Sequence, residues 1–258
     1  SGFDIGSLLY KTSPGRENGG GRTRDFHVFR EFRRSYRAES PEGKAEMRQV
    51  LLALVAMCWA SAANAEGEPA GDFDYYVLSL SWSSAWCALE GDGRDDQQCD
   101  PGRGLTFVLH GLWPQYEDGY PSYCRTGERD PTRAMTAAMV DIMGGAGLAF
   151  YEWKKHGRCS GLSAESYFQT ARQAFQAITV PSLFAGVDRS LSLPASVIED
   201  AFLEANPGMS SDQITITCKQ GLIQEARICL TRDLSLRRCG DDVIPDCTLQ
   251  DAVLEPVR

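Results

Sequence analysis

Two of the chain's three histidines lie in short runs of residues that suit proton transfer. His110 opens the run HGLWP, directly after a short apolar stretch. His156 lies in the run YEWKKHG, which predicts a helix that stops at the glycine. Residues three and four apart share one face of a helix, so Glu152 is expected beside both Lys155 and His156.

These residues suit general acid–base catalysis on an anionic substrate. Imidazole titrates near neutrality, so two histidines can hold opposite protonation states and serve as acid and base. A fixed lysine stabilises negative charge that gathers in a transition state, and a carboxylate orients or tunes its neighbours. Cleavage of RNA by its own 2′-OH needs these groups and no metal, whereas DNA lacks the reacting hydroxyl.

Each residue taken alone also has a simpler structural explanation. A histidine at a strand end is more often a structural residue, and Trp113 and Trp153 fit a hydrophobic core, Trp153 more readily. Glu152 and Lys155 fit a solvated ion pair of little energetic value. The presence of both runs in one chain favours the catalytic interpretation.

Both runs resemble the two active-site motifs of the ribonuclease T2 family, the acid-type endoribonucleases of bacteria, fungi, plants and animals. The resemblance extends over residues 72–247 in order, in spacing and in the terminal cysteine pattern. It implies cleavage of single-stranded RNA to 2′,3′-cyclic phosphates and then, more slowly, to 3′-phosphates, with no cofactor and no metal ion. The resemblance implies that His110 is the general acid and His156 the general base. It implies that Lys155 stabilises the transition state with Glu152 as its supporting carboxylate, and that Trp113 binds the nucleotide.

The chain departs from many relatives at two places. Tyr151 stands where eukaryotic members often have a phosphate-binding histidine, a form that resembles bacterial members. A phenol donates a hydrogen bond but carries no positive charge. We therefore expect Tyr151 to contact the substrate, and the phosphate affinity of the family does not transfer to this position. Ser81 and Ser83 flank Trp82 where plant and fungal members have Gln-Trp-Pro, so base preference is not implied.

The N-terminal part predicts a secretory leader. The first methionine is Met47, and an apolar stretch over 50–57 is followed by the small-residue pattern Ala-Asn-Ala, which ends at residue 65. This pattern is typical of a signal peptide over 47–65, with residues 1–46 as a non-native or over-long leader. The alternatives are a cytoplasmic extension with an internal anchor, and a buried helix. We expect a single catalytic domain over 66–258, periplasmic or secreted, monomeric, and free of the membrane after signal cleavage.

The cysteines favour an oxidising compartment. Cys58 falls in the signal peptide, which leaves eight, and spacing alone does not choose among their pairings. A zinc site is disfavoured because the short paired spacings are missing and both remaining histidines are assigned. The family resemblance implies the disulfides Cys124–Cys159, Cys218–Cys247 and Cys229–Cys239, which leaves Cys87 with Cys99.

Charge and composition exclude several classes of protein. Hydrophobic residues make up 43%, as in globular chains, and no apolar run reaches the roughly 20 residues of a membrane span. Residues 66–258 carry 16 Lys and Arg against 28 Asp and Glu, a formal charge of −12, unlike a DNA-coating protein. We expect RNA to approach this negatively charged protein through a local positive patch of Lys154, Lys155 and Arg158. We also expect faster cleavage at mildly acid pH.

The residue patterns predict strands at both ends of the domain and helices in the middle. Residues 75–82 and 105–109 favour strands, with His110 at the end of the second. Residues 214–218 alternate and lead through a turn at Gln220 and Gly221 into 222–230, which predicts a hairpin. We therefore expect an α+β fold with a mostly antiparallel sheet, helices packed alongside, and disulfides, as in ribonuclease T2.

Three helices are expected between these strands. One follows Asp130-Pro131, with Met135, Met139 and Ile142 on one face. Another is capped by Ser163, and the third opens with a capping box at Ser196 and ends before the Asn-Pro-Gly run at 206–208. The second carries a core stripe, formed by Phe168, Ala171, Phe175 and Ile178.

Two further functions compete with an RNA-cleaving enzyme. One is a secreted RNA-binding or cytotoxic protein whose catalytic residues are vestigial, which the retention of His110, Glu152, Lys155 and His156 disfavours. The other is a metal-dependent phosphodiesterase, which the shortage of histidine and aspartate clusters disfavours.

Overall fold

The computed structural model describes residues 67–258. The predicted leader over 1–46 and the signal peptide over 47–65, with Cys58, lie outside the described residues. Among residues 67–258, none of the helices combines the length and the hydropathy that a membrane span needs.

A six-stranded sheet organises the described part of the chain, in the order β2-β1-β5-β6-β3, with β4 paired to β5. All pairs are antiparallel except β5 with β6, which confirms the mostly antiparallel sheet. The hairpin is also confirmed, since β4 and β5 pair across Gln220 and Gly221, both of which have positive φ. The strands are β1 (Tyr75–Trp82), β2 (Phe107–Gln115), β3 (Leu191–Leu193), β4 (Ile214–Lys219), β5 (Leu222–Leu230) and β6 (Ala252–Leu254).

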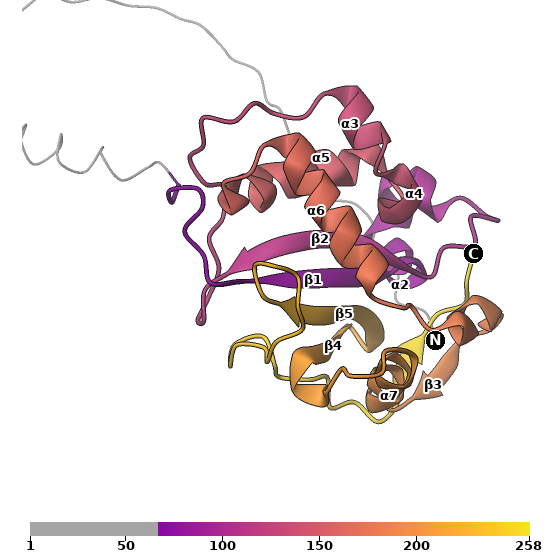
Figure 1. Cartoon of the computed structure of the whole chain (residues 1–258). Coiled ribbons are helices and arrows are strands. Elements are labelled where there is room, and N and C mark those ends of the chain that lie inside the picture. The colour runs from indigo at the N-terminus through magenta and orange to yellow at the C-terminus, as the bar shows by residue number, and fades with distance from the viewer. Residues whose placement is uncertain (1–66) are drawn as a thin grey trace, which may run out of the picture. The chain divides into compact units, whose positions relative to one another are not determined.

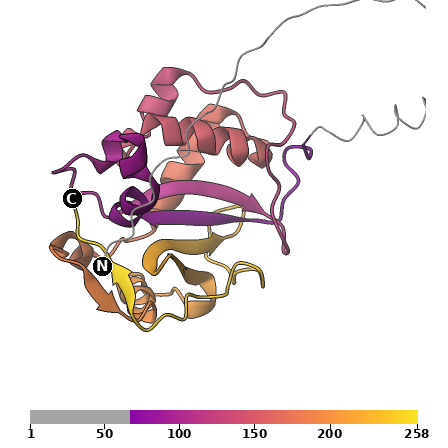
Figure 2. The ribbon, with the colours of Figure 1, turned by 180° about the vertical axis from the view of Figure 1, so that it is seen from behind.

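The strands β1, β2 and β5 divide their side chains between two faces because successive side chains alternate. Leu78 and Leu80 of β1 point into the main core. Ser79 and Ser81 of β1 point to the other face, where they lie in register with residues of β5. Helix α6 crosses in front of β1 and β2 in Figure 1 and behind them in Figure 2, so it covers the core face of these strands. The opposite face of β1 carries these polar serines together with Tyr75 and Val77, which belong to a smaller buried cluster.

The helices follow most of the predicted boundaries. Ser163 caps α6 as expected, because its hydroxyl accepts a hydrogen bond from the Ser166 N–H. The predicted capping box at Ser196 is wrong: Ala195 already has helical dihedral angles, so Ser196 lies inside the first turn and cannot cap it. The helices are α2 (Ser83–Trp86), α3 (Arg133–Ala137), α4 (Val140–Met143), α5 (Ala146–Lys155), α6 (Ala164–Ala177) and α7 (Ser196–Ala205).

The helix expected after Asp130-Pro131 is broken into α3 and α4. The guanidinium of Arg172, on α6, donates a 2.6 Å hydrogen bond to the carbonyl of Ala138, at the break between the two. A carbonyl turned toward a side chain leaves the regular helical ladder, so the prediction of one continuous helix is wrong. The predicted apolar face is confirmed, because Met139 is buried in the main core and Met135 and Ile142 pack against that core.

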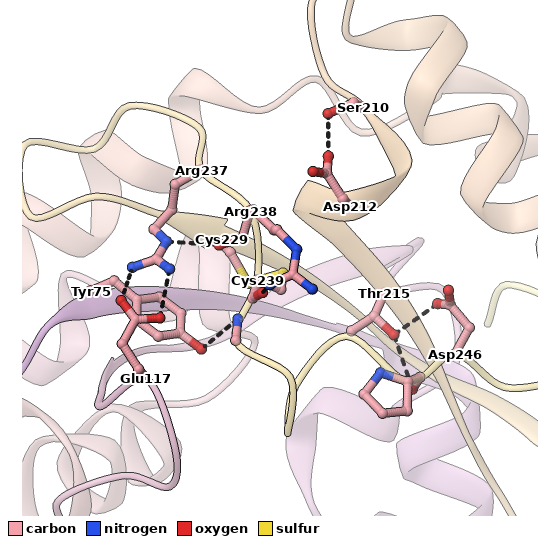
Figure 3. The surroundings of a disulfide bond; sticks show 12 residues. Tyr75, Glu117, Ser210, Asp212, Thr215, Cys229, Arg237, Arg238, Cys239 and Asp246 are labelled. Carbon is pink, nitrogen blue, oxygen red and sulfur yellow. Dashed lines mark hydrogen bonds and ion pairs between the residues drawn. A yellow bond between two sulfur atoms is a disulfide. The ribbon is translucent and has the colours of Figure 1, made fainter.

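Four disulfides join the eight cysteines of the described part, and all four predicted pairs are confirmed. The Cys124–Cys159 bond ties the loop after β2 to the chain just beyond α5. Figure 3 shows the surroundings of Cys229–Cys239, where the Tyr75 hydroxyl accepts a hydrogen bond from the Gly240 N–H at 3.2 Å. The Cys229–Cys239 bond therefore lies beside the start of β1.

Candidate active site

His110 lies on a bulge in β2, and not at the end of a strand as predicted. Ser79 of β1 pairs with Gly111 and the next residue, Leu80, pairs with Leu109, so His110 is left over between them. The strand continues to Gln115, because the neighbouring β1 supplies backbone partners that the local sequence does not reveal. A bulge re-aims a side chain, and here it directs the imidazole into the site.

The imidazole of His110 lies between two buried glutamates. Its Nδ1 is 2.6 Å from Oε1 of Glu225, and its Nε2 is 3.5 Å from Oε1 of Glu152. The imidazole side chain is 27% exposed, whereas both glutamate side chains are at most 2% exposed. One ring nitrogen is therefore held by β5 while the other remains near the open part of the site.

These contacts keep His110 positively charged more readily than a free histidine. Burial by itself lowers the pKa of His110, but the hydrogen bond to Glu225 and the charges of both glutamates outweigh it and raise that pKa. Burial also acts to raise the pKa of Glu225, yet His110 and Arg227 hold it at about 2. Burial raises the pKa of Glu152 in spite of His110 and Trp113.

His156 has the opposite surroundings. It follows the last residue of α5, is 3% exposed, and its buried Nδ1 has no hydrogen-bond partner in the described part of the chain. Burial, and then the charges of Lys155 and His110, lower the pKa of His156 to about 3. His156 is therefore a neutral imidazole over the physiological range of pH.

Trp113 separates the two imidazoles. Its ring stacks on His156 at 5.1 Å between centroids and meets His110 edge-on at 5.2 Å. Its indole N–H donates a 2.6 Å hydrogen bond to Oε2 of Glu152. This close approach depends on Gly111, because a Cβ there would lie 2.2 Å from that same glutamate oxygen. Trp113 and Glu152 thus set the spacing of the two histidines.

One cavity of about 790 Å³ contains all six predicted active-site and substrate-binding residues. Tyr151 is 46% exposed, and the Lys155 ammonium lies 6.0 Å from the rings of both Tyr151 and Tyr120. The cavity thus presents an ammonium and phenol rings next to the two imidazoles. The six predicted residues are His110, Trp113, Tyr151, Glu152, Lys155 and His156.

Comparison with known proteins places this geometry in a family. Residues 73–239 match the model of the Ribonuclease T2 family. The chain is 36% identical over 219 residues to a ribonuclease of Aeromonas hydrophila, covering 81% of this chain and 98% of that one. The chain belongs to the ribonuclease T2 family. It is a T2-type endoribonuclease that acts on RNA.

Solved structures share the ribonuclease T2 fold. Trichomaglin, an S-like ribonuclease, is similar with a TM-score of 0.56 at 21% identity, covering 71% of this chain and 97% of that one. RNase NT, solved in complex with 5′-AMP, is similar with a TM-score of 0.50 at 22% identity, covering 71% and 98%. At this level of identity the likeness shows the fold.

The positive patch predicted for this T2 ribonuclease is not formed as expected. Lys154 pairs with Asp130 at 3.0 Å, and neither Lys154 nor Arg158 lines the cavity. Lysines 154 and 155 are adjacent on a helix and point in different directions, so only Lys155 faces the site. The other cations that line the cavity come from outside α5: Arg94, Lys219 and Arg227.

Two residues of the T2 site were missed by the sequence reasoning. Glu225 and Arg227 lie on β5, and Glu225 is almost wholly buried. The signal was present, because these charged residues alternate within the otherwise mainly apolar run 222–230 and must share one face of the strand. The partner of that face, His110, lies 115 residues earlier and was not deducible from spacing.

A zinc site formed by cysteines finds no support in the T2 fold. Among residues 67–258, the one grouping of potential metal-binding side chains is Cys87, Asp92 and Cys99. Its two cysteines are bonded to each other, so their sulfurs are not available as thiolate ligands.

Proposed function

We propose that the protein is an exported, metal-independent endoribonuclease that cleaves single-stranded RNA by attack of the 2′-OH on the adjacent phosphorus. The products are 2′,3′-cyclic phosphates and then, more slowly, 3′-phosphates. The observation that carries the proposal is the pair of imidazoles around Trp113, since the pKa of His110 is raised and that of His156 is lowered to about 3. Two groups whose pKa values are driven apart are what an acid and a base require.

In the first step, His156 accepts the proton of the 2′-OH and His110 supplies a proton to the leaving group. The 2′ oxygen forms a bond to phosphorus while the bond from phosphorus to the 5′ oxygen breaks, and the departing oxygen takes the proton from Nε2 of His110. Nε2 is the nitrogen available for this transfer because Nδ1 is bound to Glu225. In the second step, water attacks the cyclic phosphate with the two roles exchanged.

The other cavity residues bind and stabilise. Lys155 stabilises the negative charge that develops on the phosphoryl oxygens. Glu152 has a supporting role: its carboxylate accepts a hydrogen bond from the Trp113 indole and lies beside His110. Trp113 and Tyr151 offer aromatic faces to the nucleotide, and Tyr151 offers a hydroxyl to the phosphate. The 5′-AMP bound to RNase NT, a protein of the same fold, supports a nucleotide site of this kind.

The chemistry of the carboxylates supports metal independence. A catalytic metal needs ligands with free oxygens directed at one point. Here Oε2 of Glu152 accepts from Trp113, and both oxygens of Glu225 are bound to His110 or Arg227. The acid, the base and the stabilising cation are all side chains. Because the nucleophile is the 2′-OH, the chain cleaves RNA and leaves DNA intact.

Export is supported by two features of the chain. Residues 47–65 have the pattern of a signal peptide. The four disulfides are typical of an oxidising compartment, such as a periplasm or the exterior of a cell. We infer that the exported protein begins at Glu66 and is a single catalytic domain, monomeric in solution.

One assay tests this function against its competitors. The full chain and its His156→Ala variant are incubated with single-stranded RNA in EDTA, and the products are identified by ³¹P NMR. We expect undiminished cleavage to cyclic phosphates in EDTA, and a loss of about 10²- to 10⁴-fold in the variant. Activity that disappears in EDTA would identify a metal-dependent phosphodiesterase. Binding of RNA without cleavage, with or without EDTA, would identify a vestigial RNA-binding protein.

A further inference from the structure

We propose that Glu225, fixed in place by Arg227, is a positioning residue for His110: its carboxylate binds the Nδ1–H and so directs Nε2 at the departing 5′ oxygen. This inference rests on the proposed function of His110 as the acid. It concerns residues of β5 that neither the two motifs nor the spacing of the histidines indicates.

The geometry of Glu225 assigns each carboxylate oxygen to one partner. Oε1 lies 2.6 Å from Nδ1 of His110. Oε2 accepts from Nε and Nη2 of Arg227 at 2.9 and 2.7 Å. Such paired bonds from a guanidinium define the plane of a carboxylate, so Glu225 has little freedom to turn away from His110.

The contact from β5 to β2 passes over the intervening strand β1. Ser81 lies in register with Glu225 on one side, and Ser79 lies in register with Arg227 on the same side. Strands two positions apart are separated by roughly 10 Å, so side chains meet across β1 only if its own side chains are small. The two serines provide that space. The bulge at His110 then turns the imidazole toward it.

These contacts form a closed network of side chains that includes both sides of the site. The Arg227 guanidinium lies 5.4 Å from the centre of the Trp113 ring, and Trp113 in turn binds Glu152, which faces Nε2 of His110. His110 has no cross-strand partner on β1 at the bulge, so this closed network fixes its orientation. A residue that merely filled space would need neither the charge nor the two separate oxygens.

The charge of Glu225 also controls how firmly His110 holds its proton. The charged or titratable groups around the imidazole come from three elements. They are Glu225 and Arg227 from β5, Glu152, Lys155 and His156 from α5 and its end, and Glu90 from the short helix Cys87–Gly91. Of these, Glu225 makes the hydrogen bond that opposes the effect of burial most strongly. Glu225→Gln keeps the shape and an accepting oxygen but removes the charge. We expect it to lower the pKa of His110.

The first test measures that effect directly. The imidazole of His110 is titrated by NMR in the full chain and in Glu225→Gln, and kcat/KM for RNA is recorded against pH. We expect the titration of His110 and the alkaline limb of the profile to move together to lower pH, by about one unit or more. Glu117→Gln is the matched control, because it breaks an ion pair with Arg237 and does not line the cavity. An unmoved His110 titration in folded Glu225→Gln would overturn the proposal.

The second test separates positioning of the acid from general damage. A nucleoside 3′-(p-nitrophenyl phosphate) has a leaving group that departs without protonation, so its cleavage needs the base and not the acid. We expect Glu225→Ala to lose about 10²-fold toward RNA while its activity on this ester stays within a few-fold. Equal losses on both substrates would assign Glu225 a structural role only. If the unaltered chain cleaves neither substrate, the proposed function fails, and the NMR titration still tests the contact.

Discussion

The two histidines of the site occupy opposite kinds of surroundings although they flank the same indole ring. His110 is supplied by the sheet, on a bulge, and is held between two carboxylates. His156 is supplied by the end of a helix, is buried against Trp113, and has Lys155 as its neighbour. The pKa of the first is raised and that of the second is lowered to about 3.

This difference shows that the identity of a catalytic group is set by what surrounds it. Buried carboxylates beside an imidazole raise its pKa and so favour the protonated form. Burial beside a cation lowers the pKa of an imidazole and so favours the neutral form. In the proposed mechanism the sheet supplies the acid and the helix supplies the base, and Trp113 and Glu152 form the contact between them. Three changes, ordered by expected effect, test each side of this arrangement.

The largest effect is expected on the helix side, from Lys155→Gln. The change removes the cation that faces the cavity, so charge that develops on the phosphoryl group is no longer stabilised. We expect kcat/KM for RNA to fall by about 10³-fold. The adjacent Lys154→Gln is the control, because Lys154 pairs with Asp130 outside the cavity and should leave kcat/KM within about twofold. Similar losses in the two variants would show that net charge, and not position, matters.

A smaller loss is expected on the sheet side, from Gly111→Ala. The added Cβ would lie 2.2 Å from Oε2 of Glu152 and 2.4 Å from the Trp113 indole nitrogen, so their hydrogen bond must break or shift. A displacement of about 1 Å in a catalytic group costs about 10²-fold in rate, and we expect a loss of this size in kcat. Gly186→Ala is the comparison, since a Cβ there meets nothing within 4 Å. Normal kcat in Gly111→Ala would show that this contact does not position the histidines.

The smallest effect near neutral pH is expected from a change of pH alone, with the chain unaltered. His156 must be neutral, so kcat/KM should fall as pH decreases toward about 3, where this residue takes up its proton. His110 must be charged, so kcat/KM should also fall on the alkaline side, as pH rises through the raised pKa of His110. We expect a bell-shaped profile with a broad acid side. A rate that rises steadily to about pH 9 would contradict the assignment of His110 as the acid.

Local patterns predicted much of the fold. The strand at 75–82 and the hairpin at 214–230 were recognisable because alternation and the turn at Gln220 and Gly221 are encoded by neighbouring residues. The helix capped by Ser163 was recognisable for the same reason. Two of the failures arose where a distant group intervened. Arg172 binds the carbonyl of Ala138 at the break between α3 and α4, and β1 extends β2 beyond His110.

The candidate site divides in the same way. The six residues of the two motifs could be identified from local patterns, because residue types and spacing bring Glu152, Lys155 and His156 together at the end of one helix. Which histidine holds a proton more firmly follows from the folded arrangement. That property depends on burial and on the contact of His110 with Glu225, which is 115 residues away and reaches it across β1. Strand register and a bulge create this contact, and neither is encoded within a short stretch of chain.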